Sequence, residues 1–296
     1  MTATDRQTGA PAAPESTMNQ SPNSKPTPCV ELSLPSGERA SVALFGGQLL
    51  SWVTADGVER IYLSPKALFD GATPIRGGVP VCFPQFNLRG PLPKHGIART
   101  LPWQAQDTGD TACARLRLSD SDATRRWWPQ AFDATLTVQL APQRLRLAFE
   151  VRNTDSVDWP FALALHSYLR VEAIEQARLC GLQGLPYWDA VEDAEATERD
   201  DEIEFTEQFD RVYSHVPDGA VLELRQGGAP LKITQSDTLT ETVVWNPGAD
   251  LSAALTDMPA DGFRHMLCVE AAKVDQPVVL APRERWQGWQ QFELAD

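Results

Sequence analysis

Two residues of types that transfer protons stand in short segments typical of β-strands. One is His166, within residues 161–170 (FALALHSYLR). Because successive side chains of a strand point to opposite faces, this segment has a leucine-rich face and a second face with two alanines, His166, Tyr168 and Arg170. The small alanine side chains would leave room beside the imidazole for a ligand. From the residues alone two interpretations stay open: a structural histidine, which is the commoner case, or a histidine that faces a ligand.

The other residue is Glu270, within residues 266–274 (MLCVEAAKV). In a strand its carboxylate would share a face with Met266, Cys268 and Ala272, and such apolar surroundings make a charged group costly. Two explanations are open. Either the carboxylate is half of a buried ion pair with an arginine of another strand, or its pocket adjusts it for proton abstraction.

Cations gather in a loop-like stretch, residues 75–99 (IRGGVPVCFPQFNLRGPLPKHGIAR). Its four prolines restrict the backbone and its four glycines let a ligand approach closely, so polar groups here are expected to be held in place. An ordinary surface connection with scattered basic residues is the alternative. The polar candidates in this stretch are Arg76, Gln85, Lys94, His95 and Arg99.

These segments resemble the signature motifs of a known family. The strings RGG-PVCFPQF and LPKHG-AR, followed by HSY-L and later by CVE, resemble the hexose-6-phosphate mutarotases (glucose-6-phosphate 1-epimerases), a branch of the aldose 1-epimerase superfamily. The resemblance covers residues 30–295. It implies that Glu270 is the general base and that His166 is the catalytic histidine. It also implies that Asp210, in FDRVY, contacts sugar hydroxyls.

The resemblance further implies the binding roles of the loop. Arg76 and Arg99 match arginines that contact phosphate, a task that suits the planar guanidinium because it bonds phosphate oxygens in pairs. Lys94 stands where the resemblance predicts a glutamine, so it adds a charge and removes an acceptor. His95 is expected as a second imidazole near the sugar ring, and Gln85 is expected to reach the ligand.

One acid and one base suffice for the reaction that the resemblance implies. A reducing sugar interconverts its anomers when O1 loses a proton and the ring oxygen O5 gains one. We expect this for D-glucose 6-phosphate and related hexose 6-phosphates, with Glu270 taking the O1 proton and protonated His166 donating to O5. The two groups are expected to face each other across a sugar-sized gap that has guanidinium groups at its far end. No cofactor and no metal is expected, since the sequence has no nucleotide-binding glycine motif and no metal-ligand cluster.

Two other functions stay open. A non-catalytic carbohydrate or sugar-phosphate binding protein would fit the same fold, because fold does not fix function. A glycoside hydrolase usually needs two carboxylates that flank the scissile bond, and here a histidine accompanies a glutamate instead. Trp245 and the pair Trp286 and Trp289 are candidates for stacking on a sugar, although buried packing is the commoner use of tryptophan.

The elements that must hold these groups are short alternating segments separated by turn residues. Residues 30–34 and 40–44 read as one hairpin, and residues 132–140 and 145–151 read as another. Many strands at such spacing predict an all-β fold, an antiparallel sandwich or barrel. The resemblance implies a large antiparallel β-sandwich of the galactose mutarotase-like (supersandwich) type. The acidic residues 191–204 are expected to form a solvated insertion with a short helix at 194–198.

Composition sets the remaining expectations. Residues 1–28 are polar and predict a disordered tail, and residues 29–296 predict one domain. No apolar run is long enough for a membrane span and no secretory signal is visible, so no membrane partner is expected. Five widely spaced cysteines favour a reducing cytoplasm. The net charge of −14 argues against nucleic acid, so the expected partner is a small-molecule sugar phosphate, bound by a monomer.

Overall fold

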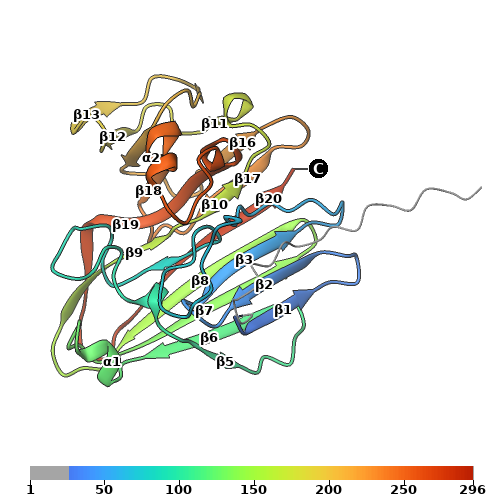
Figure 1. The fold of residues 1–296 in the computed structure, drawn as a ribbon. Helices are drawn as coiled ribbons and strands as arrows, with labels where there is room; N and C mark the ends of the chain where they lie inside the picture. The colour runs from blue at the N-terminus through green and yellow to red at the C-terminus, as the bar shows by residue number, and fades with distance from the viewer. Residues whose placement is uncertain (1–26, 296) are drawn as a thin grey trace, which may run out of the picture.

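Antiparallel sheets form most of the part of the chain that the computed structural model describes, residues 27–295. This confirms the all-β class. Residues 1–26 of the expected tail lie outside the described residues, and the first strand begins at Cys29. In Figure 1 the N-terminal strands (blue) lie across green strands of the largest sheet.

An eight-stranded sheet positions the candidate site. Its strands are β4 (Val81–Cys82), β9 (Trp159–Leu165), β10 (Tyr168–Arg170), β12 (Pro186–Asp189), β13 (Ala194–Thr197), β15 (Phe209–Tyr213), β18 (Glu241–Asn246) and β19 (Met266–Leu280). The order across the sheet is β13-β12-β15-β18-β19-β9-β4, and β10 also pairs with β19. Strand β19 therefore lies at the centre, between the segments that carry His166 and Asp210.

A nine-stranded sheet forms the second large layer. Its order is β14-β11-β16-β17-β20-β8-β7-β6-β5. The predicted hairpin at residues 132–151 is present as its longest pair of neighbouring strands. The strands are β5 (Gln104–Gln106), β6 (Cys113–Ser119), β7 (Phe132–Ala141), β8 (Arg144–Asn153), β11 (Arg178–Cys180), β14 (Glu202–Ile203), β16 (Leu222–Arg225), β17 (Leu231–Gln235) and β20 (Arg285–Leu294).

The remaining elements are short. A third sheet contains β1 (Cys29–Ser33), β2 (Arg39–Ala43) and β3 (Gln48–Val53). The helices are α1 (Asp122–Arg125) and α2 (Gly248–Ala254), with single turns η1 (Ala98–Thr100), η2 (Ile174–Gln176) and η3 (Gly262–His265). None of the helices within residues 27–295 has the length and apolar character that crossing a membrane requires.

The facing surfaces of the two large sheets share one hydrophobic core. Leu163 and Leu165 of β9 and Val269 of β19 enter it from one sheet, and Leu147 and Phe149 of β8 enter it from the other. All five side chains are buried. This shared core holds the eight-stranded sheet in place, because close-packed protein interiors tolerate little movement.

The opposite face of the eight-stranded sheet, here called the outer face, carries smaller residues. Ala162 and Ala164 of β9 pack in a separate cluster with Ala272 of β19. Met266 and Cys268 of β19 belong to a third cluster on this face. The division into a leucine face and an alanine face that alternation predicted is therefore confirmed. The outer face is the one on which a ligand has room.

Residues 161–170 do not form the single strand that alternation predicted. Strand β9 ends at Leu165 and β10 begins at Tyr168. The N–H of His166 bonds the carbonyl of Pro80, and the N–H of Ser167 bonds the carbonyl of Leu165. The backbone therefore leaves the strand ladder at His166.

The helix predicted at residues 194–198 is wrong. Residues Ala194–Thr197 form strand β13, which makes a hairpin with β12. Glu198, directly after it, is buried and accepts hydrogen bonds from Arg211 at 3.0 Å and from Tyr213 at 2.6 Å. Part of the acidic run therefore forms the edge strand of the eight-stranded sheet, which the local charge pattern did not reveal.

Candidate active site

Strand register places Glu270 beside His166. Strand β19 pairs with β9 at Ala271 and Leu165, and with β10 at Cys268 and Tyr168. Between these two pairs, Glu270 and His166 lie next to each other where β9 gives way to β10, with both side chains on the outer face. Residues directly opposite in neighbouring strands have adjacent side chains, so two separate sequence segments form one site.

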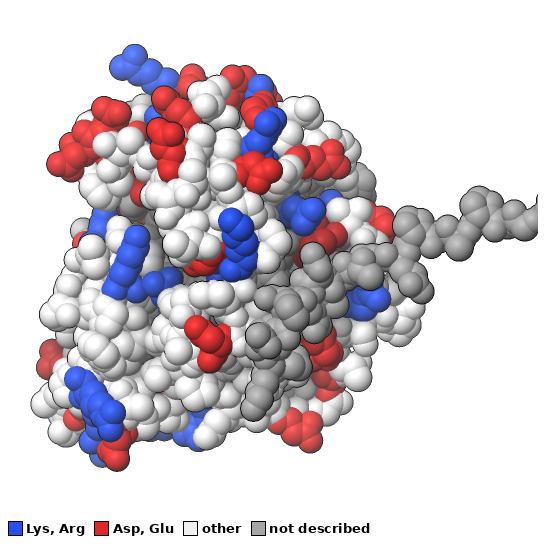
Figure 2. Space-filling model, viewed as in Figure 1, with Lys and Arg blue, Asp and Glu red and all other residues white. Residues whose placement is uncertain are grey.

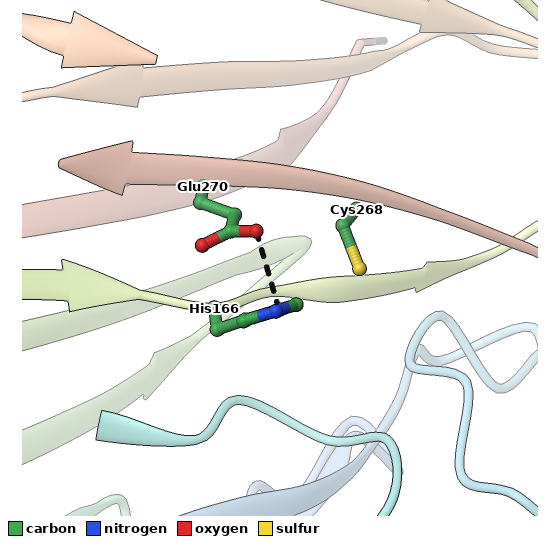
Figure 3. A group of neighbouring side chains, drawn as sticks. All are labelled: His166, Cys268 and Glu270. Carbon is green, nitrogen blue, oxygen red and sulfur yellow. Dashed lines mark ion pairs between the residues drawn. The ribbon is translucent and has the colours of Figure 1, made fainter. Parts of the chain in front are cut away.

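The two side chains touch. Nδ1 of His166 lies 3.4 Å from Oε1 of Glu270, and the side chains are 10% and 1% exposed (Figure 3). The expected sugar-sized gap between them is therefore wrong, and a sugar that used both groups would have to lie over the pair instead of between its members. Because O1 and O5 of a pyranose are both bonded to C1, neighbouring groups on one side can serve both oxygens.

Burial holds both members of the pair toward their neutral forms. Loss of water raises the pKa of Glu270 well above its usual range, and the charge of Asp210 adds to this. Loss of water lowers the pKa of His166 well below its usual range, and the cations of residues 76–99 add to that effect. A protonated carboxyl group beside a neutral imidazole holds one transferable proton. The alternative of an ion pair between Glu270 and a buried arginine is not formed, because its partner is His166.

Each of the two side chains has a polar atom that forms no hydrogen bond with another of the described residues. Within residues 27–295, Nδ1 of His166 and Oε2 of Glu270 are buried and have no hydrogen-bond partner. Unsatisfied buried polar atoms are rare in folded proteins and concentrate where function requires them. Together with the perturbed pKa values, they make this pair the candidate functional site.

Aromatic rings orient the His166 imidazole. The Tyr168 ring is parallel to it, with centroids 4.8 Å apart and planes 9° apart. The Trp245 ring lies nearly perpendicular to it with centroids 6.0 Å apart, and the His95 ring packs against it with centroids 5.4 Å apart. A ring packed in this way has few rotamers to choose from, so the orientation of the imidazole is restricted.

A tight loop brings His95 to the pair. His95 and Gly96 both adopt the left-handed backbone conformation, with φ of 65° and 72°. A Cβ atom at Gly96 would lie 2.3 Å from the Phe83 carbonyl oxygen, so only glycine fits. The Asn87 N–H donates to Nδ1 of His95 at 3.4 Å, which leaves the ring proton on Nε2. Burial lowers the pKa of His95, so it offers a hydrogen bond as a neutral imidazole.

Gln85 holds the same loop together. Its Nε2 donates to the carbonyls of Asn87 and Leu92, each at 3.0 Å, and its Oε1 accepts from the Leu92 N–H at 2.9 Å. Both amide protons are used, so only one Oε1 lone pair is left for a ligand. The contact expected of Gln85 with the ligand stays a prediction, whereas its hydrogen bonds position the loop that carries His95.

Arg76 is bound by a carboxylate that the sequence did not reveal. Its Nε lies 3.1 Å from both oxygens of Asp257, and its Nη1 donates to the Tyr168 hydroxyl at 3.1 Å. The two partners fix the direction of the guanidinium, and Asp257 offsets part of its charge. Asp257 stands 181 residues along the chain from Arg76, and no motif marks it.

Arg99 and Lys94 supply positive charge that is less compensated. Nη2 of Arg99 donates to the Lys94 carbonyl at 2.9 Å, and neither side chain forms an ion pair with a carboxylate of the described residues. In Figure 2, several Lys and Arg side chains lie in the middle of the face in view, with a few acidic ones between them, whereas acidic side chains gather above, over β12 and β13. The site is therefore locally favourable to an anionic group in a protein of net charge −14.

Asp210 lies on β15, two strands from Glu270. Burial raises its pKa from 3.8 to about 6, with Asp189 adding to the increase and Lys94 and Arg89 opposing it. Its charge in turn raises the pKa of Glu270. Asp210 is thus coupled to the pair, and its contact with sugar hydroxyls stays a prediction.

Replacement of Asp210 by asparagine should stabilise the protein more at pH 7 than at pH 5. The folded protein holds the Asp210 proton more tightly than the unfolded chain, so the free energy of unfolding falls as pH rises from 3.8 to about 6. The amide cannot ionise and escapes this loss. We expect the stability difference between variant and wild type to grow by about 1 kcal/mol between pH 5 and pH 7, after allowance for partial solvent screening. Denaturant unfolding at both pH values measures it, and a difference that shrinks with rising pH would contradict the burial argument.

One group of side chains has the composition of a metal site. Donor atoms of His166, Cys268 and Glu270 lie within 4.8 Å of one another, and all three residues are buried (Figure 3). Cys268 was not among the expected site residues. A carboxylate and an imidazole that coordinate an ion cannot at the same time exchange protons with a sugar. The metal function and the proton-transfer function therefore exclude each other here.

Comparisons with known proteins point in one direction. The family model described as aldose 1-epimerase matches residues 28–293. A protein of Cenchrus ciliaris named "Putative glucose-6-phosphate 1-epimerase" is 34% identical over 261 residues, which span 84% of this chain and 79% of the relative. A protein of the same name from Escherichia coli (strain K12) is 36% identical over 240 residues, 79% of each chain.

Solved structures agree with the fold. The crystal structure of a "putative mutarotase" from Salmonella typhimurium superposes with a TM-score of 0.80 at 29% identity, covering 90% of each chain. A galactose mutarotase-like protein from Lactobacillus casei ATCC 334 gives a TM-score of 0.72 at 16% identity, covering 90% of this chain and all of the other, and shows the fold alone. The expected galactose mutarotase-like sandwich is confirmed.

Proposed function

The chain belongs to the aldose 1-epimerase family, and on that premise we propose that it interconverts the α and β anomers of D-glucose 6-phosphate and related hexose 6-phosphates. The family establishes the reaction class: the protein is an isomerase whose ligand is a sugar. The phosphorylated substrate is supported by the names of the curated relatives and by the positive charge beside the pair.

In this proposal the proton shared by the pair does the chemistry. Glu270 first passes its proton to His166. The resulting carboxylate then accepts the proton of O1 while protonated His166 donates a proton to O5, so the bond between C1 and O5 breaks and the aldehyde forms. Rotation about C1–C2 turns the other face of the aldehyde toward O5. Reclosure with the roles reversed gives the other anomer and restores the pair. Each transfer contributes about 10²–10⁴-fold to the rate, and no covalent intermediate forms.

The surrounding groups bind and orient the sugar. Arg76, Arg99 and Lys94 hold the 6-phosphate, which supplies binding energy remote from the reacting carbon. Neutral His95 donates a hydrogen bond from Nε2 toward the ring, and Asp210 accepts from sugar hydroxyls. Gln85 acts through the loop that it closes. No metal and no cofactor takes part.

The observation that carries the proposal is the 3.4 Å contact of His166 with Glu270 in a buried outer-face site. Exchange spectroscopy by proton NMR at anomeric equilibrium tests it, because cross-peaks between the two H1 signals of glucose 6-phosphate report the exchange rate. The rate should rise in proportion to protein concentration and persist after dialysis against a chelator.

Two outcomes would overturn the proposal. If glucose 6-phosphate shifts the protein's own NMR signals while its anomers relax at the buffer rate, the chain is a binding protein. If the chain instead releases sugar from a glycoside, it is a hydrolase. Neither rival function has a specific observation in its favour.

Three further features complete the proposal. One catalytic domain spans residues 29–296 after the N-terminal tail of residues 1–28. The protein acts as a monomer, and it works in the cytoplasm, which the five cysteines support because none is in a disulfide. The Cys82 and Cys268 thiols are fully buried, and burial raises the pKa of each.

A further inference from the structure

A continuous series of contacts joins the proposed anion site to the proton-transfer pair. Asp257 fixes Nε of Arg76, with both carboxylate oxygens at 3.1 Å. Nη1 of Arg76 donates to the Tyr168 hydroxyl at 3.1 Å. The Tyr168 ring stacks on the His166 imidazole at 4.8 Å, and that imidazole touches Glu270 at 3.4 Å. Every step of this series is a direct contact between buried or half-buried groups.

The cations near this series of contacts disfavour the protonated form of His166, which is the proposed acid. Burial is the largest cause of the lowered pKa of His166, and the three cations Arg99, Arg76 and Lys94 lower it further. The proposed chemistry needs His166 protonated, so the unliganded site is in the less favourable state. A dianion beside the cations would cancel most of their effect, because opposite charges interact strongly in a site with little water.

We propose that a tetrahedral dianion held by Arg76, Arg99 and Lys94 activates the His166–Glu270 pair even when it is not attached to the sugar, with Tyr168 as the positioning residue that links the two sites. The inference rests on the proposed function and adds an activity to it: dianion-activated mutarotation of aldoses that carry no phosphate. The phosphoryl group of a hexose 6-phosphate would then increase the rate of the chemical step as well as binding.

D-Xylose and inorganic sulfate together supply, as separate molecules, the sugar ring and the dianion of a hexose 6-phosphate. D-Xylose has the pyranose ring of glucose without C6, so it leaves space for a separate dianion. Sulfate has the shape and charge of a phosphate dianion but is too weak a base to catalyse mutarotation by itself. The sulfate concentration to use is the one at which sulfate inhibits the exchange of glucose 6-phosphate by competition. If sulfate did not compete at all, the inference would already be overturned.

Polarimetry of D-xylose mutarotation then compares sulfate with chloride at equal ionic strength. A change of one pKa unit alters the protonated fraction of a group about tenfold, so we expect sulfate to raise the enzymatic rate roughly tenfold. An unchanged or lower rate in sulfate overturns the inference. The parallel assay with glucose 6-phosphate distinguishes failure of the proposed function from failure of this inference. If that sugar is turned over while sulfate does not raise the rate with xylose, the proposed function stands and this inference falls. If neither occurs, both fall.

Tyr168→Phe tests the positioning role. The variant keeps the ring that stacks on His166 and removes the hydroxyl that Arg76 bonds, so the ratio of the rates in sulfate and chloride should fall toward one. Tyr187→Phe on strand β12, next to the edge strand β13, is the matched control, and it should keep the full ratio. Arg211 packs over the Tyr187 ring at 4.4 Å, and β12 lies three strands from β19 in the sheet. Full activation in Tyr168→Phe would overturn the role of this residue, because a merely structural tyrosine would leave the ratio unaltered.

Discussion

Replacement of Glu270 by glutamine lowers kcat for the mutarotation of glucose 6-phosphate by about 10²–10⁴-fold, because the amide cannot accept the O1 proton. The side chain keeps its shape and remains beside His166, so sugar binding should change little. Stability should not fall, since the substitution removes a buried ionisable group whose raised pKa reflects its cost of burial. The NMR exchange assay measures the rate, and thermal unfolding measures the stability.

Glu198→Gln provides the opposite pattern as a control. Glu198 is a buried acid outside the site, which Arg211 and Tyr213 bond at 3.0 and 2.6 Å. Its substitution should lower Tm while kcat stays near that of the wild type. If Glu270→Gln turned over glucose 6-phosphate at the wild-type rate, the assignment of Glu270 as the base would be wrong.

His166→Ala, alone and combined with Glu270→Gln, tests whether the pair acts as a unit. Groups that share one proton are strongly non-additive, so the double variant should lose little more than the worse single variant. Losses that multiply would show two independent roles and would contradict the shared-proton mechanism.

Arg99→Ala reduces kcat/KM for glucose 6-phosphate roughly 10- to 150-fold and leaves kcat/KM for free glucose nearly unaffected. The range corresponds to one charge-assisted hydrogen bond to phosphate, about 1.5–3 kcal/mol. Arg99 gives a clearer result than Arg76, because removal of Arg76 also leaves Asp257 without its partner. Initial rates with both sugars measure the selectivity.

Arg117→Ala on β6 is the control for a lost arginine. Exposed Arg117 pairs with half-buried Asp133 on the nine-stranded sheet, away from the site, and its replacement should change neither rate. If Arg99→Ala slowed both sugars equally, Arg99 would hold the sugar ring or the loop instead of the phosphate.

The local sequence determined which residues could transfer protons and on which face of their strands they lie. The period of two in residues 161–165 and 266–272 depends only on the backbone of each strand, so it correctly placed the alanines and Glu270 on the face away from the leucines. Glycine at position 96 and the prolines around it similarly indicated a rigid loop, because left-handed backbone and restricted φ are properties of single residues.

Only the tertiary structure decided how these residues meet. Register between β9, β10 and β19 brings His166 into contact with Glu270, and it replaced the expected gap by a 3.4 Å contact. The partnership of Arg76 with Asp257 and the buried position of Glu198 likewise depend on segments that are distant in the chain. Such contacts follow from how whole sheets pack and bury surface together, and a local pattern contains no information about its partner across the sheet.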